Sequence, residues 1–177
     1  MKSNKLIFNW GCIRKHEKGY RKALRQCKKN KKRFGVGFDN SETWNLDWTF
    51  LMYLYNTRWT KWDPKLDEFL KEYMFSREDD YICDKYNIPK YDYQNIAEIE
   101  NKLISDVFAS VNQLDDVKKK QLSDFLIPRL IVFKENLHGY PANMSEVSWN
   151  EYIDETIEEL KQLNFDKFEA RLGCFWD

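Results

Sequence analysis

The stretch YQNIAEIENKLISDVFASVN, residues 93–112, decides the fold class. Its apolar residues recur at intervals of three and four, the spacing that places side chains on one face of an α-helix. The resulting stripe contains Ile96, Ile99, Leu103, Ile104, Val107, Phe108 and Val111. The pattern predicts a long amphipathic helix, from about Tyr93 to Asn112, with one buried face.

Helical spacing continues upstream of this stretch. We expect a first helix over residues 13–34, ended by the glycines at 35 and 37, because glycine stops a helix at little cost. A second helix, capped by Asp39 or Ser41, should run to about residue 56. The order Asp63-Pro64 marks the start of a third. Residues 76–92 lack periodicity and are predicted to form a loop.

Downstream, a helix is expected over residues 115–137, with a kink or a break at Pro128. Ser148 and Glu151 have capping-box spacing at the start of the last long helix. A short helical tail over 165–172 follows. The sequence therefore predicts an all-α fold: a single helical domain, residues 1–177, with about six or seven helices.

Composition narrows the class further. Of 177 residues, 42% are hydrophobic and 33% charged, and the mean hydropathy of −0.76 is typical of a globular protein. No apolar run approaches the ~20 residues of a membrane span, so no membrane partner is expected. The first eight residues are too polar for a secretory signal, and the four cysteines have no Cys-x-x-Cys spacing. These features favour reduced thiols and a cytoplasmic location.

The formal charge of zero conceals a strong asymmetry. Residues 1–36 hold thirteen Lys and Arg against one Glu, a net charge of +12, so residues 37–177 carry −12. We define these segments as the basic head and the acidic body. The candidate contact residues of the head are Arg14, Lys15, Lys18, Arg21, Lys22, Arg25, Lys28, Lys29, Lys31, Lys32 and Arg33. Such density would make salt-dependent contacts to phosphates, with Tyr20 or Phe34 available to stack on bases. The alternative is that the head docks on the body.

Catalytic and metal-binding patterns are incomplete. Glu135-x-x-His138 has the spacing of one half of a di-iron site, but the sequence holds no second copy. Cys12, His16, Cys27 and Cys174 are zinc-type ligands that one helix could not bring together. We therefore expect no metal, no cofactor and no catalytic residues, which indicates a non-enzymatic protein.

Five residues are predicted to be structural. Trp44 and Trp149 should be core anchors, and Tyr140 should form a rigid corner with the proline that follows it. Asp47 and Arg129 each stand as one charge among apolar neighbours, with opposite signs. Because buried charges need partners, we expect these two to form an ion pair.

Four blocks carry a resemblance to a known family. They are GFDNSETWNLD at 37–47, FLIPRLIVFKEN at 125–136 and GYP at 139–141, followed by SWNEYI at 148–153. Together they resemble a family of small bacteriophage and prophage proteins, in which the W-x-L-D helix runs almost directly into P-R-L. Residues 51–124 would then be an insertion relative to that family.

The resemblance implies a phage source in a bacterial host, and it carries no mechanism. With the absence of catalytic patterns and a high aromatic content suited to interfaces, it favours an accessory protein that binds a host or phage protein. An inhibitor of a host defence system is one form such a protein would take. The alternative is a nucleic-acid-binding protein that uses the basic head. The oligomeric state stays open.

Overall fold

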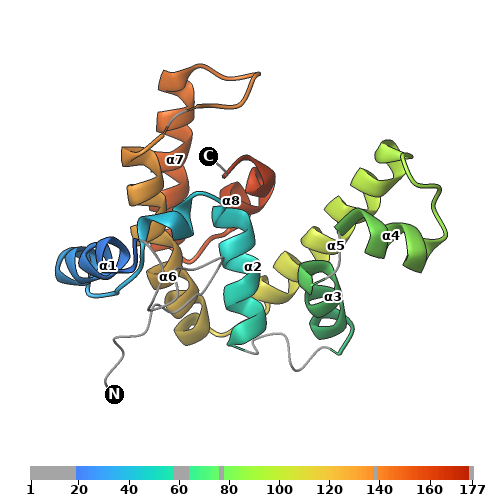
Figure 1. Cartoon of the computed structure of the whole chain (residues 1–177), viewed down its shortest axis with the longest axis horizontal. Coiled ribbons are helices and arrows are strands. Elements are labelled where there is room, and N and C mark those ends of the chain that lie inside the picture. Colours follow the sequence, from blue (N-terminus) through green and yellow to red (C-terminus); the bar gives the residue numbers. More distant parts are fainter. Residues whose placement is uncertain (1–18, 58–63, 76–77, 138, 176–177) are drawn as a thin grey trace. The chain divides into compact units, whose positions relative to one another are not determined.

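The structure, a computed structural model, describes residues 19–57, 64–75, 78–137 and 139–175. Eight α-helices and two 3₁₀ helices run through these residues, and no β-strand occurs among them, which confirms the all-α class (Figure 1). The elements are α1 (Tyr20–Phe34), η1 (Asn40–Thr43), α2 (Leu46–Asn56), α3 (Pro64–Phe75), α4 (Glu78–Tyr86), α5 (Tyr93–Asn112), α6 (Asp116–Glu135), α7 (Glu146–Lys161), α8 (Asp166–Ala170) and η2 (Leu172–Cys174).

Packing divides the chain into two compact units. The first unit comprises residues 1–50 and 116–177, and the second comprises residues 51–115. The boundary falls within α2 and again just before α6.

The first unit is built on α6 and α7, which pack side by side, with η1 against α6 and α1 against η1 (Figure 1). Its core contains an aromatic cluster around Phe175. The rings of Phe168 and Trp149 lie 5.1 Å and 5.3 Å from that of Phe175, and Phe133 lies 5.9 Å away. The backbone N–H of Leu46 donates to the Phe175 carbonyl at 2.8 Å. The end of the chain is thereby tied to the start of α2.

We expected a kink or a break at Pro128, and the break does not occur, because α6 continues as one helix through this residue. Proline lacks an N–H, and its presence inside a helix removes one backbone hydrogen bond. Here the proline and most of its neighbours are buried, including Leu126, Arg129 and Leu130. Their packing holds the helix together where local propensity would end it.

The second unit contains α3, α4 and α5, each packed against the other two. Helix α5 has the predicted bounds, Tyr93–Asn112. The prediction of a loop over 76–92 was wrong, because α4 forms within it and buries Ile82 and Cys83. Ile82 and Cys83 are adjacent in the sequence, so these two buried residues show no helical period.

Two helix starts also differ from expectation. Asp39 caps η1 rather than a continuous helix to residue 56, and α2 begins only at Leu46. The last long helix is capped by Ser145, with Ser148 as the third helical residue, so it begins three residues before the predicted Ser148 cap.

Candidate nucleic-acid interface

Helix α1 carries the described part of the basic head. Its fifteen residues include no acidic side chain, and all of its cations are exposed. Those cations are Arg21, Lys22, Arg25, Lys28, Lys29, Lys31, Lys32 and Arg33. Arg14, Lys15 and Lys18 lie outside the described residues. The structure therefore brings eight of the eleven predicted contact residues onto one helix.

Six of these cations share one face. Successive residues of an α-helix are rotated by roughly 100°, so residues 21, 22, 25, 28, 29 and 32 fall within an arc of roughly 120°. Ala23, Cys27 and Asn30, the buried residues of α1, lie on the opposite side. We call these six residues the basic face: Arg21, Lys22, Arg25, Lys28, Lys29 and Lys32.

The cations of the basic face repel one another. Arg21 and Arg25, Arg25 and Lys29, and Lys28 and Lys32 are like charges four residues apart, each costing helix stability by about 0.2–0.5 kcal/mol. No acidic residue on α1 offsets this cost. A ligand with closely spaced negative charges would relieve it.

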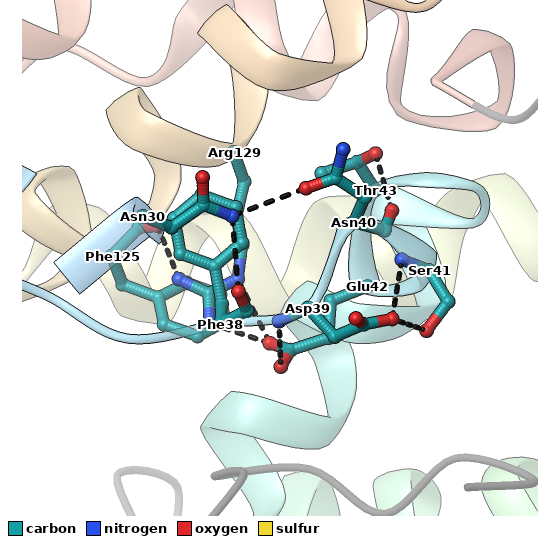
Figure 2. Close-up of polar contacts among 9 residues, drawn as sticks. All are labelled: Asn30, Phe38, Asp39, Asn40, Ser41, Glu42, Thr43, Phe125 and Arg129. Carbon is teal, nitrogen blue, oxygen red and sulfur yellow. Dashed lines mark hydrogen bonds and ion pairs between the residues drawn. The ribbon is translucent and has the colours of Figure 1, made fainter. Parts of the chain in front are cut away.

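Asn30 fixes α1 to the loop that follows it. Its side chain is 3% exposed, and its amide nitrogen donates to the Phe38 carbonyl at 3.0 Å and to Asn40 Oδ1 at 3.1 Å (Figure 2). A buried amide that makes these bonds has a strong orientational preference. The basic face is therefore held in a defined direction by a residue on the far side of its own helix.

The turn after α1 needs its glycines. Gly35 has φ +78°, a left-handed conformation, and its N–H donates to the Lys31 carbonyl at 3.0 Å. This is the glycine stop that the sequence predicted. At Gly37, a Cβ atom would lie 2.9 Å from Cys27 Sγ, so a larger residue here would require the Cys27 side chain to shift.

The segment that follows this turn contains one partner of a buried ion pair that the sequence did not predict. Arg129 Nη2 and Nε donate to Glu42 Oε2 at 2.6 Å and 3.2 Å, and Nη1 donates to the Phe125 carbonyl at 2.9 Å (Figure 2). Arg129 and Glu42 are 1% and 3% exposed. We predicted Asp47 as the carboxylate partner of Arg129, but the structure places Glu42 there. Asp47 lies in the first turn of α2, where it accepts a hydrogen bond from the Trp48 N–H.

Glu42, and not Asp47, pairs with Arg129 because of the backbone conformation at residues 39–42. Asp39 and Glu42 form a capping box on η1, in which Glu42 Oε1 accepts from the Asp39 N–H at 3.2 Å. Asp39-x-x-Glu42 is the sequence signature of such a box, and it could have identified Glu42. Burial raises the pKa of Glu42, and the Arg129 guanidinium opposes that rise.

Aromatic rings complete the surroundings of Arg129. Its guanidinium carbon lies 4.5 Å from the centre of the Phe38 ring and 3.8 Å from that of Phe125 (Figure 2). Stacking of this kind suits the planar guanidinium and would not suit a lysine. Asn30 and Arg129 thus bind the 38–42 segment from α1 and α6, which positions α1 on the first unit.

One cation of the head does dock on the acidic body. Arg33 Nη1 and Nη2 donate to Glu135 Oε2 and Oε1 at 2.8 Å and 2.5 Å. The Arg33 hydrogen bonds lower the pKa of Glu135, and the charge of Lys29 acts in the same direction. Arg33 lies outside the basic face, so this pair leaves those six cations on the exposed side.

Of the two tryptophans predicted to be core anchors, one is buried and the other is exposed. Trp149 is 1% exposed, as expected, but Trp44 is 56% exposed, so its assignment to the core was wrong. The 3₁₀ helix η1 ends the run before Trp44, which shifts the buried stripe of α2 to other residues, including Leu46 and Phe50. Tyr140 is 53% exposed beside its proline.

The metal-ligand candidates do not gather. No group of three His, Cys, Asp or Glu side chains in the described ranges is arranged to hold a metal ion. Glu135 is bonded to Arg33, and burial raises the pKa of Cys27. Cys12, His16 and His138 lie outside the described residues. Among the helices that the structure describes, none has the length and apolar character needed to cross a bilayer.

Comparisons with protein-family models, with curated proteins and with solved structures each found no match.

Proposed function

We propose that this protein binds nucleic acid through the basic face of α1. The observation that supports the proposal is the six exposed cations on one side of a helix that contains no acid and is anchored by its opposite side. Lys and Arg neutralise phosphates and release the condensed counterions, which is the main source of sequence-independent affinity. Docking on the acidic body accounts for Arg33, which bonds to Glu135, and of the six residues of the basic face Lys29 is the one whose charge acts on the pKa of Glu135.

The test is the salt dependence of binding to a fluorescein-labelled 20-base-pair DNA, followed by anisotropy. If six phosphates are contacted, affinity should fall about 1000-fold between 50 mM and 200 mM salt. The variant Lys22→Gln/Lys28→Gln/Lys29→Gln/Lys32→Gln leaves two cations on the face, and its affinity should fall only about 10-fold over the same range. Glutamine keeps a long side chain and a good helix propensity.

A matched control removes the same charge elsewhere. Lys102, Lys118, Lys120 and Lys161 are exposed and lie outside α1, and their replacement by Gln should leave the salt dependence as in the parent. Equal loss in both variants would show a general charge effect and contradict the proposal. A thermal melt of the parent and the α1 variant at low salt distinguishes nucleic-acid binding from the docking alternative. If the head docks on the acidic body, the α1 variant should be less stable than the parent. Relief of repulsion on α1 predicts equal or higher stability instead.

A second candidate is an accessory protein that binds a host or phage protein, in line with the resemblance to phage proteins. Exposed Trp44 favours it, because tryptophan is enriched at the centres of protein interfaces. Affinity capture from nuclease-treated bacterial lysate, with the parent and with Trp44→Ala, tests it. One protein that the parent retains and Trp44→Ala loses would support this candidate. Recovery that disappears with nuclease would contradict it and favour the basic face.

A further inference from the structure

The composition of the basic face indicates how it would contact a nucleic acid. All six of its side chains donate hydrogen bonds and none accepts one. Asparagine and glutamine, the side chains that recognise adenine, are absent from the arc. Asn30 is buried and bonded to Phe38 and Asn40, and Gln26 lies at the edge of the arc and is only partly exposed. The face therefore suits phosphate oxygens, and guanine is the one base whose edge its donors would recognise.

The aromatic side chains of α1 lie away from the basic face. Tyr20 and Phe34, which the sequence offered as stacking residues, are both partly buried and fall on the same side of the helix as Ala23 and Cys27. The Phe34 ring is covered by the Arg33 guanidinium at 4.6 Å and has the Phe38 ring at 6.1 Å. Proteins that hold single strands use aromatic platforms beside a basic groove. The basic face offers no such platform.

Charge spacing matches a duplex. Residues 21 to 32 span about 16 Å of helix, along which duplex DNA presents roughly ten negative charges. Over that length the duplex presents more negative charges than the face has cations. The helix is also held rigidly by Asn30 and by the turn at Gly35 and Gly37, so its cations approach as a preformed row.

From these observations we propose that the basic face binds the phosphate backbone of double-stranded nucleic acid, without reading sequence and without stacking bases. This inference rests on the proposed function and names its ligand class. The same backbone chemistry is present in DNA and RNA duplexes, and the experiment distinguishes them.

The experiment compares five labelled 20-mers at 100 mM salt: two DNA duplexes of unrelated sequence, one RNA duplex, and the two separated strands of the first DNA. For six contacts, the different counterion densities predict duplex binding about 10-fold tighter than binding of either strand. The two DNA duplexes should bind within about 3-fold of each other, because backbone contacts carry no sequence information. Preference for either duplex type over single strands supports the inference, and the tighter one identifies the source.

Three outcomes would overturn it. If single strands bind as tightly as the duplexes, the inferred preference for duplexes is wrong, although nucleic-acid binding itself is still supported. A preference above 10-fold between the two DNA sequences would show base readout, with the same consequence. No binding of any oligonucleotide at 50 mM salt would remove the proposed function as well. The quadruple α1 variant, checked by thermal melting, should lose most of its duplex preference, since two remaining cations predict a difference of about 2.5-fold.

Discussion

Arg129 and Glu42 form a buried ion pair between segments 87 residues apart, with Nη2 and Oε2 separated by 2.6 Å. The pair links α6 to the capping box of η1. Phe38 and Phe125 flank the guanidinium, and Arg129 is almost fully buried. Because both charges are buried, the loss of either one would leave the other without its ion-pair partner in a site of low water content.

We expect Glu42→Ala to cost about 3–5 kcal/mol of unfolding free energy, the usual effect of breaking a buried ion pair. Chemical denaturation followed by tryptophan fluorescence measures it. Asp124→Ala provides the control, because it removes the exposed Lys120–Asp124 pair and should cost less than about 1 kcal/mol. Equal losses of unfolding free energy in the two variants would show that the buried Glu42–Arg129 pair contributes no more to stability than an exposed pair.

The two tryptophans should respond differently to truncation. Trp149→Ala removes a buried ring that packs on Tyr152 and Phe175, and should cost about 3–5 kcal/mol. Trp44→Ala alters an exposed side chain and should change stability by no more than about 0.5 kcal/mol. Denaturation midpoints of the two variants decide this. A large loss for Trp44→Ala would place its ring in the core after all.

Gly35 and Gly139 offer a matched pair of glycines. Neither has a neighbouring atom within 4 Å of an added Cβ, but only Gly35 has a left-handed backbone, φ +78°. Gly35→Ala should therefore destabilise the protein by about 1–2 kcal/mol through backbone strain alone. Gly139→Ala should be neutral or slightly stabilising, because alanine restricts the unfolded chain. Thermal melts of both test the left-handed helix end, and equal effects would contradict it.

The pair between Arg33 and Glu135 should make stability depend on acid. The pKa of Glu135 is lowered from its ordinary value of 4.5 by the Arg33 hydrogen bonds. A carboxyl with a depressed folded-state pKa contributes stability above its unfolded pKa and loses it as the pH falls through the folded value. Relative to Glu135→Gln, the parent should thus lose stability below about pH 4.5.

The effect should be small, because both side chains are about half exposed and salt screens them. Melting curves of the parent and Glu135→Gln between pH 2.5 and 6, at low salt and at 0.5 M salt, measure it. Parallel pH profiles for the two proteins at low salt would show that the ion pair is not formed in solution.

The helical class, most of the helices and several of their ends follow from local chemistry. A seven-member apolar stripe determined α5 to the residue, and the glycine after α1 ended that helix where expected. The basic face could also be recognised from sequence, because a dense run of cations with helical period needs no partner to define it. These features depend on residues within a few turns of one another, which is the range over which periodicity and capping act.

Tertiary contacts decided the rest. The partner of Arg129 depended on whether η1 or a longer helix followed residue 39. With η1 there, Glu42 is buried and Trp44 is exposed. Helix α4 and the unbroken α6 likewise exist because burial of Ile82 and of the residues around Pro128 outweighs weak local propensity. By itself the sequence determined which residues are charged, apolar or helix-ending. Which charges meet, which tryptophan is buried and which way the basic face points were decided by packing between distant segments, because the free energy of burial is shared among residues that local patterns cannot bring together.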